Sequence, residues 1–125
     1  MYLVIDNSID NQVLFYTCLN TKWVQAVISL EGKSLLQALD EYCRSLDKDL
    51  KDIEGIAVVV GKGRFTSTRV AATMANALAL SLGVAVLAVD QFSESINQQL
   101  SGTPKGVYIS ARYSAEANIG VKKNK

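Results

Sequence analysis

The sequence predicts an α/β domain built on a mixed five-stranded sheet covered by helices, and three observations favour this class. Residues 56–60 form an apolar run that enters a turn with glycines at 61 and 63, and an alanine-rich apolar segment then extends to Gly83. A second apolar run follows at residues 84–89. This order of strand, tight turn, helix and strand is typical of a parallel βαβ unit. Upstream, three β-forming stretches joined by short turns predict an antiparallel meander.

The three strands of this meander occupy the N-terminal part of the chain. We expect them at residues 2–6, 13–19 and 22–30, with turn-forming residues at 6–8, 10–11 and 20–21. The third stretch alternates imperfectly between apolar and polar side chains, which indicates a strand at the edge of the sheet.

A first helix is predicted from near Ser34 to Leu46. Ser34 and Gln37 have the spacing of a capping box, in which a hydroxyl and an amide satisfy orphan backbone donors reciprocally. One apolar face recurs at helical spacing and comprises Leu35, Leu39, Tyr42 or Cys43, and Leu46. The charged segment 47–52 is predicted to be a loop.

A second helix is predicted over residues 68–82, capped by Thr66 or Ser67 and ended by Gly83 in a left-handed conformation. It is apolar on more than one face, and its alanines at 71, 72, 75, 77 and 79 reduce side-chain bulk. One face must cover the sheet, so we expect another to meet a partner. A third helix is predicted to be capped by Asp90 and to carry Phe92, Ile96 and Leu100.

A boundary is predicted at residues 101–106, which contain Pro104, the one proline of the sequence. Residues 1–100 would then form a β-β-β-α-β-α-β-α body. Residues 101–125 would form a linker, a short hairpin with strands at 107–111 and 118–121, and a basic tail. We interpret this tail (Lys122, Lys123 and Lys125) as a solvated terminus rather than a functional patch.

Composition excludes several classes of function. The net charge of +1 gives no electrostatic argument for independent binding of nucleic acid or membrane. Histidine is missing and neither Cys18 nor Cys43 belongs to a CxxC pair, so we expect no metal site, no Cys–His or Ser–His–Asp catalysis, and two buried thiols. The N-terminus does not read as a signal peptide and no stretch reads as a membrane span, so the expected location is the cytoplasm.

Candidate anion-binding residues follow two predicted strands: Asp6, Ser8, Gly61, Gly63, Thr66 and Arg69. Backbone N–H groups of the glycine turn could hold an anion, the guanidinium of Arg69 a carboxylate or phosphate, and Asp6 a metal-bound water or a phosphate-linked magnesium. In the structural alternative the glycines only form a tight turn, Asp6 and Ser8 only stabilise a turn by local hydrogen bonds, and Arg69 pairs with Asp6. No second carboxylate accompanies Asp6, so catalysis is poorly supported.

Two segments carry a resemblance to a known family. The strand VIDNS at residues 4–8 is similar to the strand and Asp-Thr-Ser with which TsaB (YeaZ) proteins usually open, with Asn7 replacing the threonine. Segment 58–90 resembles their signature, a strand running into Gly-Pro-Gly-Ser-Phe-Thr-Gly-Leu-Arg and a helix. It keeps Gly61, Gly63, Phe65, Thr66 and Arg69 in register and departs at Lys62, Arg64, Ser67 and Thr68. Residues 33–36 resemble the usual start of the first helix, and residues 107–116 faintly resemble the start of the second lobe.

The resemblance implies a single actin-like, ribonuclease-H-like lobe, and a non-catalytic scaffold that helps to form threonylcarbamoyladenosine in tRNA. Its partner would be a TsaD-like protein or, in isolation, a second copy, with tRNA contacted only indirectly and no membrane involved. No cofactor would be bound stably by this chain, and any ATP and magnesium would belong to the partner complex. The expected interface on the first two helices comprises Leu36, Met74, Ala75, Ala77 and Leu78.

Two other interpretations stay open. The chain could be half of an actin-like phosphotransferase or hydrolase that grips a nucleotide between Asp6 and the loop at Gly61 and Gly63. Alternatively it could be a diverged protein that associates with itself and has left the tRNA pathway.

Overall fold

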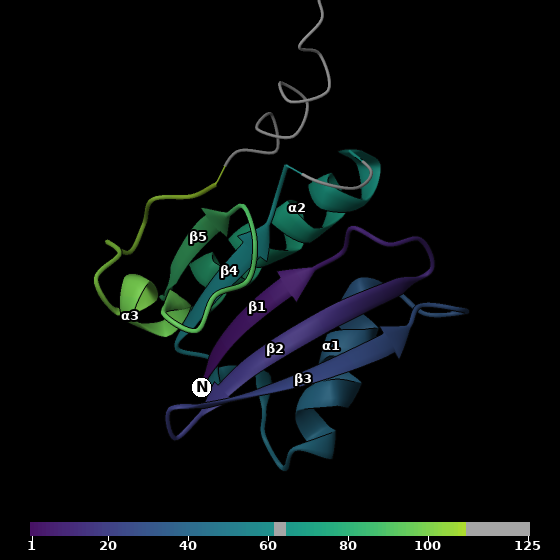
Figure 1. The fold of residues 1–125 in the computed structure, drawn as a ribbon, viewed down its shortest axis with the longest axis horizontal. Coiled ribbons are helices and arrows are strands. Elements are labelled where there is room, and N and C mark those ends of the chain that lie inside the picture. Colours follow the sequence, from purple (N-terminus) through teal and green to yellow (C-terminus); the bar gives the residue numbers. More distant parts are fainter. Residues whose placement is uncertain (62–64, 110–125) are drawn as a thin grey trace, which may run out of the picture.

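A meander and a parallel unit share one sheet. The computed structural model describes residues 1–61 and 65–109. Strands β1 (Tyr2–Asp6), β2 (Gln12–Leu19) and β3 (Lys22–Ser29) pair antiparallel, whereas β4 (Gly55–Val59) and β5 (Ala85–Val89) add in parallel on the other side of β1. The strand order is β3-β2-β1-β4-β5 (Figure 1), which confirms the mixed five-stranded sheet and the edge position of β3.

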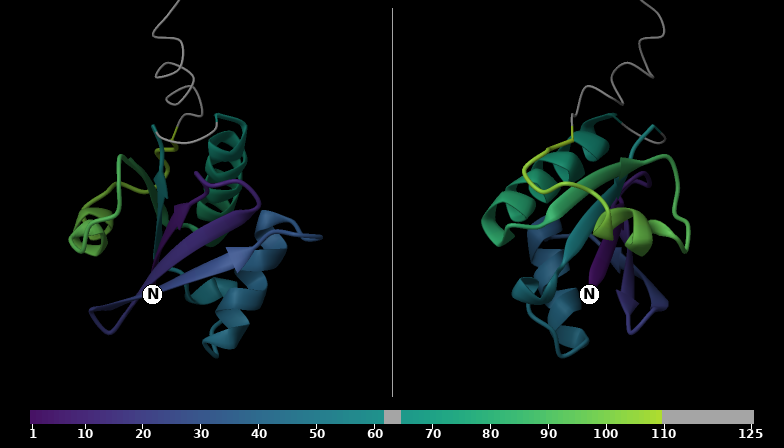
Figure 2. Two further views of the ribbon diagram at one scale, coloured as in Figure 1. Left: turned by 45° about the vertical axis from the view of Figure 1, so that its right-hand side comes forward. Right: turned by 90° about the vertical axis from the view of Figure 1, so that its left-hand side faces the viewer.

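Helices cover both faces of the sheet. Helices α1 (Leu35–Ser45) and α2 (Phe65–Leu82) lie on one face, and the short helix α3 (Ile96–Ser101) lies on the other (Figure 2). Successive side chains of β1 point to opposite faces of the sheet. Leu3 and Ile5 belong to the main core below α1 and α2, while Val4 belongs to the smaller core below α3. The central strands therefore carry continuous apolar runs, residues 2–5 in β1 and residues 56–59 in β4.

The start of α1 is the one predicted. The hydroxyl of Ser34 accepts a hydrogen bond from the backbone N–H of Gln37 at 3.1 Å, and the Gln37 side chain accepts one from the backbone N–H of Ser34 at 3.1 Å. This capping box starts the helix, and the burial of Leu35, Leu39, Tyr42 and Cys43 fixes its inner face to the main core.

Helix α2 begins earlier than predicted. It includes residue 65, so Thr66 and Ser67 lie inside the helix and the expectation that either caps it is wrong. This first turn is held by a contact from a distant part of the chain, since the Ser67 carbonyl accepts a hydrogen bond from the Asn7 side chain at 3.0 Å, and the weak preference of Ser and Thr for helix ends is overridden. The predicted end is confirmed, since Gly83 has a φ of +69° and donates its N–H to the Ala79 carbonyl at 2.8 Å.

The segment after β5 also differs from the prediction. Helix α3 starts only at Ile96, with Ser95 at its N-cap, so Asp90 does not cap it and Phe92 lies before it. The Phe92 ring stacks on the Tyr16 ring with 4.1 Å between ring centroids, and it packs edge-to-face with Trp23 with 5.1 Å between centroids. Packing on β2 and β3 therefore holds residues 90–95 as a loop across the sheet, in place of a helical turn.

Three further predictions concern irregular segments. Residues 47–52 contain a 3₁₀ turn, η1 (Leu50–Asp52). The strand expected at 107–111 is wrong for residues 107–109, which belong to no strand, and residues 110–111 and the strand at 118–121 lie outside the described residues. The division into a body of residues 1–100 and an appended segment 101–125 stays a prediction. Among the helices described here, none has the length and hydropathy needed to span a bilayer.

Candidate functional site

The carboxyl end of β1 is a turn stabilised by its own side chains. Asp6 Oδ1 accepts hydrogen bonds from the backbone N–H of Ser8 at 3.1 Å and from the Ser8 hydroxyl at 2.6 Å. Asp6 is buried. The pKa of Tyr16 on the neighbouring strand is raised, first by the burial of Tyr16 and second by the negative charge of Asp6. These contacts are the local hydrogen bonds of the structural alternative, so this carboxylate oxygen has a role in the turn itself.

Asn7 links this turn to the start of α2. Its side-chain amide donates a hydrogen bond to the Ser67 carbonyl at 3.0 Å, and the residue is buried. Asn7 is not among the site residues predicted from the sequence. The sequence could have indicated it, because Asn7 is a polar residue directly after a predicted strand, in the segment that resembles the family opening. Asn7 positions the first turn of α2 against the end of β1.

The remaining candidate anion-binding residues separate into two groups. Gly61 has a φ of +84°, a backbone conformation that favours glycine and fits the tight-turn interpretation. Gly63 lies outside the described residues. Thr66 and Arg69 lie on α2 and line a groove to which Asp6, Ser8 and Gly61 do not belong. Anion binding by these six residues stays a prediction.

That groove runs between the start of α1 and the first half of α2. It has a volume of about 540 Å³ and is lined by Ser34, Leu35, Leu36, Thr66, Arg69, Val70, Thr73 and Met74. We call it the α1–α2 groove. Leu36 is 46% exposed and Val70 is 49% exposed, so each wall presents an apolar side chain to the outside.

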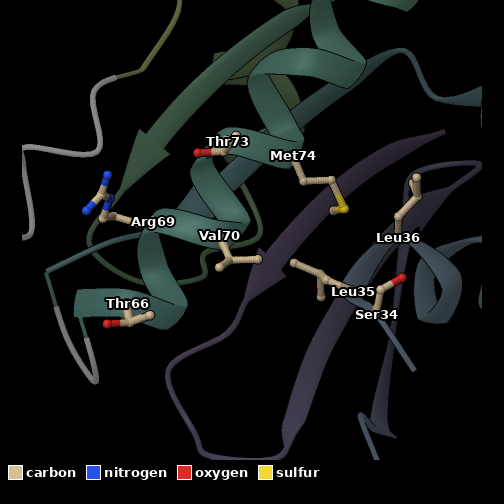
Figure 3. Close-up of a pocket in the computed structure, with 8 residues that line it drawn as sticks. All are labelled: Ser34, Leu35, Leu36, Thr66, Arg69, Val70, Thr73 and Met74. Atoms are coloured by element: carbon tan, nitrogen blue, oxygen red, sulfur yellow. The ribbon is translucent and has the colours of Figure 1, made fainter. Parts of the chain in front are cut away.

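The side chains of the groove are arranged by helical spacing. Thr66, Val70 and Met74 follow one another at intervals of four along α2. In Figure 3, Val70 points toward Leu35 and Met74 points toward Leu36, while the guanidinium of Arg69 lies on the far side of α2 from both leucines. The concave part of the groove is therefore apolar, with polar groups at its margins.

The predicted interface residues are placed differently from one another. Leu36 and Met74 line the groove, Ala77 is exposed elsewhere on α2, and Leu78 packs partly buried against the main core. Ala75 is 0% exposed, so the expectation that it contacts a partner is wrong. Its methyl group belongs to the main core between α2 and the sheet. A partner role for the other four residues stays a prediction.

The alanines of α2 explain why Ala75 does not reach the surface. Ala71, Ala75 and Ala79 recur at intervals of four and are all buried in the main core, where small side chains let α2 approach its own sheet. The groove face of the same helix is carried by Val70 and Thr73, which were not singled out. The sequence does contain a pattern that indicates this face: Val70 lies four residues after Thr66, and Thr73 lies four residues after Arg69.

Within the described ranges, no three or more His, Cys, Asp and Glu side chains are grouped so that they could hold a metal ion. Neither cysteine lines the groove: Cys18 and Cys43 are both buried and free, and burial raises the pKa of Cys43 to about 11. The groove has one cation, Arg69, among its lining residues.

Comparisons with solved structures agree with this fold. One neighbour, YeaZ from Pseudomonas aeruginosa, superposes with a TM-score of 0.62 at 22% sequence identity, over 78% of this chain and 50% of that chain. A second, described as an uncharacterized protein with similarity to peptidase YEAZ from Pseudomonas aeruginosa, has the same TM-score and identity and is covered to 48%. The chain spans about half the length of these structures and has the expected actin-like, ribonuclease-H-like lobe.

Sequence comparison identifies the family. No curated protein sequence matches the chain. A family model described as "TsaD: tRNA N6-adenosine threonylcarbamoyltransferase" matches residues 32–117, which is more than half of the 125 residues. This match and the YeaZ-like fold bear out the expected TsaB (YeaZ) resemblance. The chain therefore belongs to the TsaD family.

Proposed function

We propose that this protein acts in the cytoplasm as a non-catalytic partner subunit in the formation of threonylcarbamoyladenosine in tRNA. It would dock through the α1–α2 groove onto a TsaD-like protein and, in the absence of that protein, onto a second copy of itself. The family match and the YeaZ-like fold support the link to this modification system. The observation that carries the docking role is the apolar groove with exposed Leu36 and Val70 on its two walls.

The shape of the groove favours a helical partner. A concave apolar surface between two helices accepts a ridge of side chains from a third helix, as in other cases where an amphipathic helix binds in a groove. Burying the exposed parts of Leu36 and Val70 would contribute about 1 kcal/mol each, at the usual value for apolar area removed from water. Contributions of this size suit a reversible complex between subunits.

The role of the groove is tested by placing a charge on each wall. We expect Leu36→Arg and Val70→Arg each to weaken binding to the TsaD-like protein by about tenfold or more, because a guanidinium would have to be buried without a partner. Both positions are about half exposed, so the lobe should remain folded by circular dichroism. Affinity is measured by calorimetry and self-association by light scattering.

Leu80→Arg is the matched control, since Leu80 is 70% exposed on the same helix and does not line the groove. Unchanged affinity in both groove variants would disprove docking at this site. Heat released on titrating the isolated chain with ATP and magnesium would instead favour the nucleotide-binding alternative.

A further inference from the structure

The side chain of Asn76 holds a distant part of the chain. Its amide group donates a hydrogen bond to the Ile109 carbonyl at 2.8 Å, and its carbonyl oxygen accepts one from the Ile109 backbone N–H at 3.0 Å. An asparagine side chain offers one amide and one carbonyl, as a peptide unit does, so it can satisfy both backbone groups of one residue. Asn76 thus pairs with Ile109 as a neighbouring strand would.

This contact fixes the end of a segment that runs from α3 to α2. Residues 103–109, called the strap, run from the end of α3 to α2 (Figure 2). At the α3 end, the hydroxyl of Thr103 donates to the Gln99 carbonyl at 2.7 Å. At the α2 end, the side chain of Ile109 packs against the main core. Between these ends Val107 and Tyr108 remain exposed.

We propose that Asn76 is a positioning residue that anchors the strap, and that the strap opens as a unit while the rest of the lobe stays folded. Segments with little buried apolar surface and exposed backbone open at a lower free energy than the core of the same domain. When closed, the strap ends at α2 about one helical turn from the groove, because Asn76 follows the groove residue Thr73 by three positions. Asn76 therefore determines where Ile109, the end of the strap, sits on α2.

The test is hydrogen exchange of the full chain, read at the Ile109 amide. We expect Asn76→Ala to speed exchange of this amide by about tenfold or more, since its acceptor is lost. Asn76→Asp keeps an acceptor but loses the donor to the Ile109 carbonyl, so it should also open the strap. Core amides in β1 and β4 should exchange at the original rate in both variants. Thr73→Ala is the control, since it changes an exposed residue of the same helix without touching the strap.

Trypsin cleavage gives an independent readout. Cleavage after Lys105, inside the strap, should accelerate in both Asn76 variants, whereas cleavage after Lys51 in η1 should not. Two results would overturn the proposal: equal exchange of the Ile109 amide with and without the Asn76 side chain, or acceleration of the β1 and β4 amides together with it. The second result would make Asn76 a residue of general stability.

Discussion

At the scale of single residues, the interior depends on a few polar groups that satisfy one another. The hydroxyls of Thr17 and Tyr42 lie 3.0 Å apart, Thr17 is fully buried, and the Tyr42 ring stacks on Phe15. This hydrogen bond joins β2 to α1 within the main core. A buried hydroxyl that loses its partner is costly, whereas removing both hydroxyls together leaves no unpaired group.

The Thr17–Tyr42 pair predicts a non-additive mutant cycle. Tyr42→Phe should lower the free energy of unfolding by about 1–2 kcal/mol, because the Thr17 hydroxyl is left unpaired. Adding Thr17→Val to Tyr42→Phe should then cost less than the sum of the single changes. Urea unfolding of the three variants measures the coupling, and simple additivity would show that the hydroxyls do not interact.

Cys43 predicts a loss of stability at alkaline pH. Burial, and then the charges of Asp40, Asp49 and Asp52, raise the pKa of its thiol from 9.0 to about 11. The folded protein therefore holds this proton more tightly than the unfolded chain. The stabilisation is complete below pH 9.0 and is lost as the pH rises toward about 11.

Cys43→Ala should reduce this alkaline slope, and Cys18→Ala controls for the loss of a buried sulfur. Some slope should remain, because burial also raises the pKa of Tyr42 above 10.0. Urea unfolding across this pH range gives the slopes. An identical slope in the wild type and in Cys43→Ala would contradict the assignment.

At the scale of elements, the β2–β3 hairpin combines a long ladder with a strained turn. The ladder pairs every residue from Gln12–Ser29 to Leu19–Lys22, so a two-residue turn must reverse the chain. Both turn residues have positive φ, 52° at Asn20 and 67° at Thr21. Asparagine tolerates this region, but a β-branched side chain does so only under strain.

Thr21→Gly should therefore stabilise the protein by about 1 kcal/mol, since Asn-Gly suits a turn with positive φ at both positions. Asn20→Gly is the matched control and should have a smaller effect. Denaturant midpoints at constant slope measure both changes. A lower midpoint for Thr21→Gly would mean that the threonine side chain makes a stabilising contact outweighing its strain.

At the scale of the whole molecule, the loop between β5 and α3 connects the two edges of the sheet, from β5 at one edge to β3 at the other. Phe92 contacts Tyr16 on β2 and Trp23 on β3, and the Trp23 ring N–H donates to the Glu94 carbonyl at 3.1 Å. The aromatic cluster thus links the last parallel strand to the edge of the meander, on the face that carries only the short helix α3.

Phe92→Ala should destabilise the fold by about 2–3 kcal/mol, through lost ring packing at a partly buried site. Trp23 is the one tryptophan of the sequence, so its fluorescence reports on this cluster directly. We expect the emission to move to longer wavelength before any global unfolding. Phe92→Leu should retain more stability than Phe92→Ala, and an unchanged emission maximum in Phe92→Ala would contradict the contact.

Much of the fold could be predicted because its signals are local. The apolar runs of β1, β4 and β5, the capping box at Ser34 and the left-handed Gly83 each depend on neighbouring residues. The errors arose where distant contacts act. The Ser67 carbonyl accepts a hydrogen bond from Asn7, Phe92 packs on Tyr16, and Ile109 pairs with a side chain of α2 in place of a strand.

The sequence by itself determined the order of these elements, the mixed sheet and the presence of two helices with apolar faces, because periodicity and turn chemistry are encoded in short stretches of chain. Only the tertiary structure decided which side of α2 is free. The sheet covers the face of Ala71, Ala75 and Ala79, and the face of Val70 and Met74 is left to form a groove with α1. Helical spacing repeats around every face alike, so the burial of one face depends on where the strands lie.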